Sequence, residues 1–177
     1  MNNFQNRIIR AAKLDVSLYE EVEADKGAMF QAMGVVVLSS MAAGVGSAGS
    51  LGFIGILIGM IAALIGWYIW AYLTYIIGTK LLPEPQTKAD HGELLRTIGF
   101  SSSPGLIRVL GVIPGVGKVI FLAASIWMLV AMVIAVRQAL DYKSTLRAVG
   151  VCLIGWIIQT LIFVLLFSVL GGPVKPV

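Results

Sequence analysis

The sequence contains very little of what soluble catalytic domains are built from. In 177 residues it has one cysteine and one histidine, and charged residues make up only 12%. The single Cys152 excludes an intrachain disulfide, and the single His91 excludes a metal site made from a histidine cluster. Residues 28–79 contain no charged side chain and no histidine at all. We therefore expect no metal and no catalytic centre.

The sequence is instead rich in apolar residues. Hydrophobic residues make up 58% of the chain, and the mean hydropathy is +0.92. A soluble domain of this size could not bury so much apolar surface. The net charge of +4 does not indicate a nucleic-acid partner, because no basic run alternates with aromatic residues. The composition predicts an all-α, polytopic membrane protein.

The apolar runs predict a bundle of five membrane-spanning helices, since a span needs about 20 residues. A glycine- and serine-rich stretch at 44–52 divides the first uncharged run into two antiparallel spans. A cytoplasmic segment, 1–27, precedes the bundle, and a short tail, 171–177, follows it. The five expected spans cover about 28–47, 51–79, 94–113, 119–136 and 148–170.

The distribution of lysine and arginine predicts a cytoplasmic N-terminus. With five spans, the inside segments carry ten basic residues and the outside segments three, as the positive-inside rule requires. The inside ten are Arg7, Arg10, Lys13, Lys26, Lys80, Lys88, Arg96, Arg137, Lys143 and Arg147. The outside three are Lys118, Lys175 and, if its side chain extends outward, Arg108. A re-entrant third segment, the alternative, would place the charged hairpin 137–147 outside.

The first thirteen residues predict a short amphipathic helix. Phe4 and Ile8 share one side, and Arg7, Arg10 and Lys13 recur at steps of three on another. Such a helix can lie in the headgroup layer with its cations near anionic lipid. The alternative is a frayed terminus.

The following acidic segment, 15–26, predicts a second short helix. Asp15 can cap its N-terminus, and Leu18, Tyr19 and Val22 share one side. The segment is either a solvated helix or a docking surface for a partner.

The second span carries small residues at helical steps of three and four. They lie on one face and allow close approach between membrane helices. Packing within the bundle and self-association through the same face are the two interpretations. The face consists of Gly52, Gly55, Gly59, Ala62 and Gly66.

The later half of the second span is aromatic, from Trp67 to Tyr75. These rings are typical of interfacial belts and of packing. A lipid, pigment or quinone pocket is the alternative interpretation, and a bound lipid is the one non-protein group that we consider.

The stretch 98–118 is the most specialised part of the chain. Pro104 restricts the residue before it, which predicts a break near Ser101, Ser102 and Ser103, with Ser103 capping the helix that follows. Pro114 and Gly115 predict a turn. Arg108 either extends to the nearer membrane surface or contacts a carboxylate or an anionic ligand inside the bundle.

The three serines are not expected to form a catalytic centre. Ser101–Ser103 lack a GxSxG context, so they are better explained as capping residues. The sequence GVIPGVGK at 111–118 lacks the glycine-to-lysine spacing of a phosphate-binding loop.

The stretch 99–118 resembles the Yip family of Ypt/Rab-interacting membrane proteins, in its bacterial form. The residues that carry the resemblance are Gly99-Phe100, Ser103-Pro104, Leu106, Leu110, Ile113-Pro114 and Gly117. The resemblance implies five spans, a cytoplasmic N-terminus and no catalytic residues. Eukaryotic members are linked to small GTPases and vesicle traffic, and some bacterial relatives are associated with export complexes.

These features predict a non-enzymatic accessory or assembly subunit of a membrane complex, or a membrane-organising protein, in a bacterial inner membrane. Its expected partners are membrane lipids and other integral membrane proteins, or a second copy of the chain. A small transporter or channel is the alternative, because discontinuous helices often form substrate sites.

Overall fold

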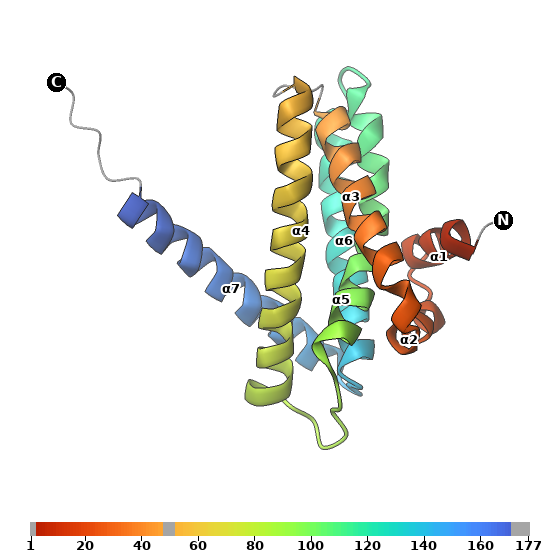
Figure 1. Ribbon diagram of the computed structural model, residues 1–177, viewed down its shortest axis with the longest axis vertical. Helices are drawn as coiled ribbons and strands as arrows, with labels where there is room; N and C mark the ends of the chain where they lie inside the picture. The colour runs from red at the N-terminus through yellow and green to blue at the C-terminus, as the bar shows by residue number, and fades with distance from the viewer. Residues whose placement is uncertain (1–2, 48–51, 171–177) are drawn as a thin grey trace.

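The structure is a computed structural model that describes residues 3–47 and 52–170. Within these residues every regular element is helical, and the long helices other than the last one form an upright bundle (Figure 1). The elements are α1 (Asn3–Ala12), α2 (Val16–Ala24), η1 (Lys26–Ala28), α3 (Met29–Gly46), α4 (Gly52–Ile76), the π-helical turn η2 (Ile77–Leu81), α5 (His91–Phe100), the 3₁₀ helix η3 (Ser103–Val112), α6 (Gly117–Ala139) and α7 (Thr145–Leu170).

Four helices are long and apolar enough to cross a membrane: Lys26–Gly46, Gly52–Leu81, Gly117–Ala139 and Thr145–Ile162. They coincide with the first, second, fourth and fifth apolar runs of the sequence. The predicted turn at 44–52 falls partly on residues 48–51, and the predicted tail is 171–177. These two segments lie outside the described residues.

The third apolar run forms two shorter pieces. A capping box opens α5, because the Asp90 carboxylate accepts from the Glu93 N–H and the Glu93 carboxylate accepts from the Asp90 N–H. The α-helix ends at Phe100, and the 3₁₀ helix begins at Ser103. Figure 1 shows the two pieces end to end beside α3 and α6, with which both are in contact.

Glycines bring η3 unusually close to α3. Gly105, Arg108 and Gly111 follow each other at steps of three, which places them on one face of a helix with three residues per turn. A Cβ on Gly105 would overlap the Ser39 hydroxyl, and one on Gly111 would come 2.7 Å from the Gly46 carbonyl oxygen. The face of η3 that lies against α3 therefore has no room for side chains at its two glycines.

The first two helices pack on the bundle and extend its core. Leu18, Tyr19 and Val22 of α2 are fully buried in a cluster that includes Phe100 of α5 and Ala135 of α6. Arg96 of α5 is also buried, and its guanidinium donates to the carbonyl groups of Val22 and Glu23 at the end of α2. The apolar side of α2 is thus covered by the chain's own bundle.

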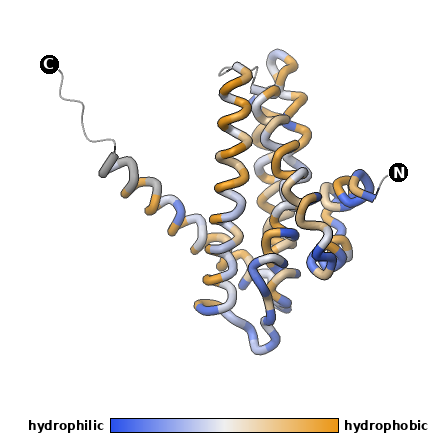
Figure 2. The backbone as a smooth tube through the Cα atoms, viewed as in Figure 1, coloured by the Kyte–Doolittle hydropathy of each residue, from blue (hydrophilic) through white to orange (hydrophobic). Residues whose placement is uncertain are grey.

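Hydrophilic segments gather around one end of the bundle. Figure 2 shows the main hydrophilic stretches as the helix pair α1–α2, which lies beside the bundle from its middle downwards, and the connection 82–90 and the residues after α6 at its lower end. Glu84 ties two of these stretches together, since its carboxylate accepts from the Lys143 and Ser144 N–H groups and pairs with Arg147. The upright part of the bundle is apolar, as expected of helices surrounded by lipid.

Helix α7 leaves the bundle at an angle and diverges from α4 (Figure 1). Its first half packs on α6, α4 and η2, where Ala148 and Val151 are buried. Further along, Trp156, Ile157 and Leu161 are each more than half exposed.

Candidate functional site

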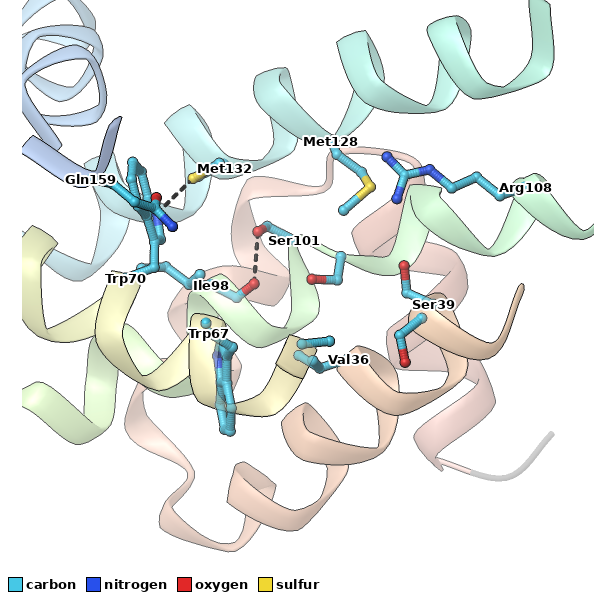
Figure 3. Close-up of a pocket in the computed structure, with 14 residues that line it drawn as sticks. Val36, Ser39, Trp67, Trp70, Ile98, Ser101, Arg108, Met128, Met132 and Gln159 are labelled. Atoms are coloured by element: carbon cyan, nitrogen blue, oxygen red, sulfur yellow. Dashed lines mark hydrogen bonds between the residues drawn. The ribbon is translucent and has the colours of Figure 1, made fainter. Parts of the chain in front are cut away.

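A partly open cavity of about 270 Å³ lies between α3, α4, α6, α7 and the break in the third segment. Its apolar walls include Trp67 and Trp70 of α4 and Met128 and Met132 of α6 (Figure 3). The Trp70 indole N–H donates to the Met132 sulfur at 2.9 Å, which holds the α4 and α6 walls together. The Trp67 N–H is used elsewhere, because it donates to the Leu95 carbonyl oxygen.

Six polar side chains line this cavity, although it lies within the apolar part of the bundle. Three of them, Ser101, Ser102 and Arg108, are residues that the sequence singled out, and the fold brings them together. The sequence analysis missed the other three as site residues. They are Ser39 and Ser40 of α3 and Gln159 of α7. Each interrupts an apolar run without charged residues, which is the signal that would have identified them.

Arg108 is the only charged side chain that lines the cavity. Its Nη2 donates to the Ser125 hydroxyl at 3.2 Å, and its guanidinium carbon lies 5.7 Å from the centre of the Phe121 ring. Its Nε is buried and has no hydrogen-bond partner among the described residues. None of the ion pairs in the described part of the chain includes Arg108. The positive charge is thus held by a hydroxyl and an aromatic face alone.

Ser101, Ser102 and Ser103, at the break in the third segment, differ in their hydrogen bonds. The Ser101 hydroxyl donates to the Ile98 carbonyl oxygen at 2.7 Å and closes the end of α5. Ser103 was predicted to cap the next helix, but the N-cap position is Ser102 and no side chain bonds there. The Ser103 hydroxyl is buried without a partner among the described residues, and Pro104 occupies the first turn of η3, as proline can.

Pro114 does not belong to this site. It is exposed in a turn between η3 and α6, where Gly115 has a φ of +85°. The turn predicted at Pro114–Gly115 is therefore confirmed, but it does not line the cavity.

The small-residue face of α4 is open where the structure describes it. A Cβ added to Gly59 or Gly66 would have no atom within 4 Å, and Ala62 is exposed. Gly52 likewise has no neighbour and has a φ of +64°, and Gly55 is partly exposed. Packing of this face within the bundle, the first of the two interpretations, is therefore absent at Gly52 and Gly59, whereas Gly66 lines the cavity. The close helix contacts of the fold are made by glycines of α3, η2, α5 and η3 instead.

The predicted interfacial residues of α1 mostly face protein. Phe4 and Ile8 pack against the cluster beneath α2. Arg7 is buried, and its guanidinium contacts Glu21 at 2.8 Å and Asp25 at 2.9 Å. Arg10 contacts Glu21 and Asp15. These two guanidinium groups are engaged by α2 and its flanking residues, which differs from the lipid contact that we expected, whereas Lys13 is exposed.

The carboxylates around α2 have pKa values that are shifted from their ordinary values, some lowered and one raised. Asp15 caps α2 as predicted, and the Ser17 hydroxyl together with Arg10 lowers the pKa of Asp15 to about 2. Hydrogen bonds from Arg10 and Arg7 also lower the pKa of Glu21. In contrast, burial and the nearby Glu93 and Asp141 raise the pKa of Glu23 to about 7.

The tyrosine rings in the aromatic half of α4 pack against His91 and do not enclose a pocket. The Tyr68 and Tyr72 rings meet the imidazole edge-on, with ring centres 4.9 and 5.5 Å away. An apolar hollow of about 440 Å³ lies nearby, lined by methionines of α3 and by Trp67 and Tyr68.

Comparisons of the chain with protein-family models, curated proteins and solved structures found no match. The resemblance to the Yip family therefore remains a prediction.

Proposed function

We propose that this chain is a non-enzymatic integral membrane protein that assembles with another membrane protein through the small-residue face of α4. The observation that carries the proposal is that a Cβ added to Gly59 would meet no atom within 4 Å among the described residues. Without a hydrophobic force between helices in lipid, close backbone approach at small residues is a main source of association. An open face of this kind suits a transmembrane helix of a partner.

The proposal includes five crossings, with α5 and η3 together forming the third. Their combined length, their position beside α3 and the mostly inside location of basic residues support this count. We also propose a cytoplasmic N-terminus, a bacterial inner membrane and Yip-family membership, the last supported by the residues between Gly99 and Gly117.

The absence of catalysis is part of the same proposal. The Ser101 hydroxyl donates to a backbone carbonyl, and His91 is surrounded by tyrosines, so neither is paired as nucleophile and base.

The test is extraction from native membrane into nanodiscs, followed by mass spectrometry of the proteins retained with the chain. Gly59→Leu should remove a stoichiometric partner, since it fills the open face. Ile61→Phe adds bulk to an exposed position of α4 outside the small-residue face and should leave the partner bound. A partner that survives Gly59→Leu, or no partner at all, would contradict the proposal.

A second candidate function is a small transporter, and the cavity at the break of the third segment favours it. Substrate sites of transporters commonly lie where helices are discontinuous near the middle of the membrane. Ser101, Ser102 and Arg108 line such a site here. Flux of anions into liposomes that contain the protein, compared with liposomes that contain the Arg108→Gln variant, tests this candidate.

A further inference from the structure

We propose that the cavity beneath Arg108 binds a phosphate-type anion, carried on a lipid headgroup or free. The inference concerns the site of the second candidate function, but it requires binding only. Binding without flux would therefore reject transport and retain this inference.

The first argument is the uncompensated charge. A charged side chain at membrane depth is costly and is retained where a partner offsets the cost. In a 3₁₀ helix with a rise of about 2.0 Å per residue, Arg108 lies about 10 Å before Ile113, so it is set back from the end of η3. Its described contacts are the Ser125 hydroxyl and the Phe121 ring, neither of which is negatively charged.

The second argument is the chemistry of the cavity. A guanidinium presents a planar fork of N–H donors that matches phosphate oxygens. Ser39 and Ser102 line the same space and can donate hydroxyl hydrogens to the remaining oxygens. Gln159 lies at the other end of the cavity, beside Trp70 and Met132 (Figure 3). No carboxylate lines the cavity, so nothing there repels an anion.

The third argument is the position of the cavity. Its wall includes Gly66 of α4 and Gln159 of α7, and these two helices diverge beyond it (Figure 1). Ser39 lies ten residues into α3, about 15 Å along the helix, so the polar lining lies deep in the bundle. A headgroup that enters between α4 and α7 would keep its acyl chains against apolar, exposed side chains such as Ile157 and Leu161.

The experiment uses the full chain and two probes. Native mass spectrometry from mixed micelles measures retention of phosphatidylglycerol relative to phosphatidylcholine. Thermal unfolding in phosphatidylcholine nanodiscs, with and without inorganic phosphate, measures binding of the free anion. Preferential retention of phosphatidylglycerol identifies a lipid headgroup, and stabilisation by phosphate identifies a free anion. Either result supports the site.

Variants assign the binding to the cavity. We expect Arg108→Gln to weaken binding of the favoured probe by about tenfold or more, because it removes charge-assisted hydrogen bonds. Arg108→Lys should restore part of it. Lys118→Gln removes a cation at the adjoining start of α6 and should leave binding unchanged, since Lys118 does not line the cavity.

A further variant keeps the test decisive if Arg108→Gln does not fold. Ala63→Leu fills part of the cavity and leaves Arg108 in place, so it should also weaken binding. Failure of both probes to bind would overturn the proposal. So would retained binding in both Arg108→Gln and Ala63→Leu, or equal loss in Lys118→Gln.

Discussion

The carbonyl oxygen of Arg108 occupies the space that a side chain on Gly46 would need. This contact joins the end of α3 to the middle of η3, and the Phe121 ring of α6 closes the same point at 3.2 Å from the added atom. A backbone oxygen cannot rotate away as a flexible side chain can. The contact therefore fixes how closely the 3₁₀ helix approaches α3.

From this contact we predict that Gly46→Ala destabilises the protein by about 1–3 kcal/mol or more, the usual cost of overpacking a tight core. Gly59→Ala is the matched control in α4. It meets open space and should be neutral or stabilising by up to about 1 kcal/mol, because alanine is the better helix former. Thermal unfolding of both variants in detergent checks the pair. Equal midpoints for the two variants would show that α3 and η3 are not in close contact.

The raised pKa of Glu23 predicts a pH dependence of stability. The folded state holds this proton to about pH 7, whereas the unfolded chain releases it near its ordinary value of 4.5. The stabilisation is therefore fully present below pH 4.5 and is lost as the pH rises to 7. The surrounding charges are Glu20, Glu93 and Asp141, with Arg137 and Lys143 on the same hollow and Arg96 beside it.

Glu23→Gln imitates the protonated carboxyl group and should remove this dependence. The variant and the wild type should unfold at similar temperatures at pH 4.5, and the variant should be the more stable at pH 8. Thermal unfolding across this range measures the difference. Parallel profiles would mean that Glu23 is ionised in the folded protein at neutral pH.

Much of the fold could be predicted from the sequence, because the length of an apolar run directly limits where a helix can cross lipid. The ranges of α3, α4, α6 and α7 follow from that limit within a few residues. Local chemistry was equally informative at Asp15, which caps α2 as its short acidic side chain predicted.

The third segment was harder to predict because its helical period differs. A search for small residues at steps of three and four assumes 3.6 residues per turn and finds the face on α4. Gly105 and Gly111 are six residues apart, which is two full turns only in a 3₁₀ helix. The local conformation had to be known before the contact face could be recognised.

The pairing of α1 with α2 was missed for another reason. It depends on a turn in which Leu14 adopts a φ of 61°. Leucine rarely takes this left-handed conformation, so the sequence did not predict the turn. Without that turn, Arg7 and Glu21 are simply fourteen residues apart. With it, Arg7 and Arg10 meet the same carboxylate.

The last prediction concerns what holds α1 in place. If ion pairs hold it, Arg7→Met should free it, because the variant loses contacts with Glu21, Asp25 and Gln31. Hydrogen bonds to charged groups contribute about 1.5–3 kcal/mol each and are not additive here, so local opening should increase about tenfold or more. Lys13→Met removes an exposed cation from the same helix and should change little.

Chymotrypsin cleavage after Tyr19 reports this opening, since Tyr19 is fully buried beneath α1 and its hydroxyl contacts the Ala11 carbonyl group. When closing is faster than cleavage, the rate follows the population of the open form. Faster cleavage of Arg7→Met alone would show that α1 is held by protein contacts. Equal acceleration of Arg7→Met and Lys13→Met in anionic vesicles would instead show that attraction to the lipid surface holds the helix, because both variants remove one positive charge.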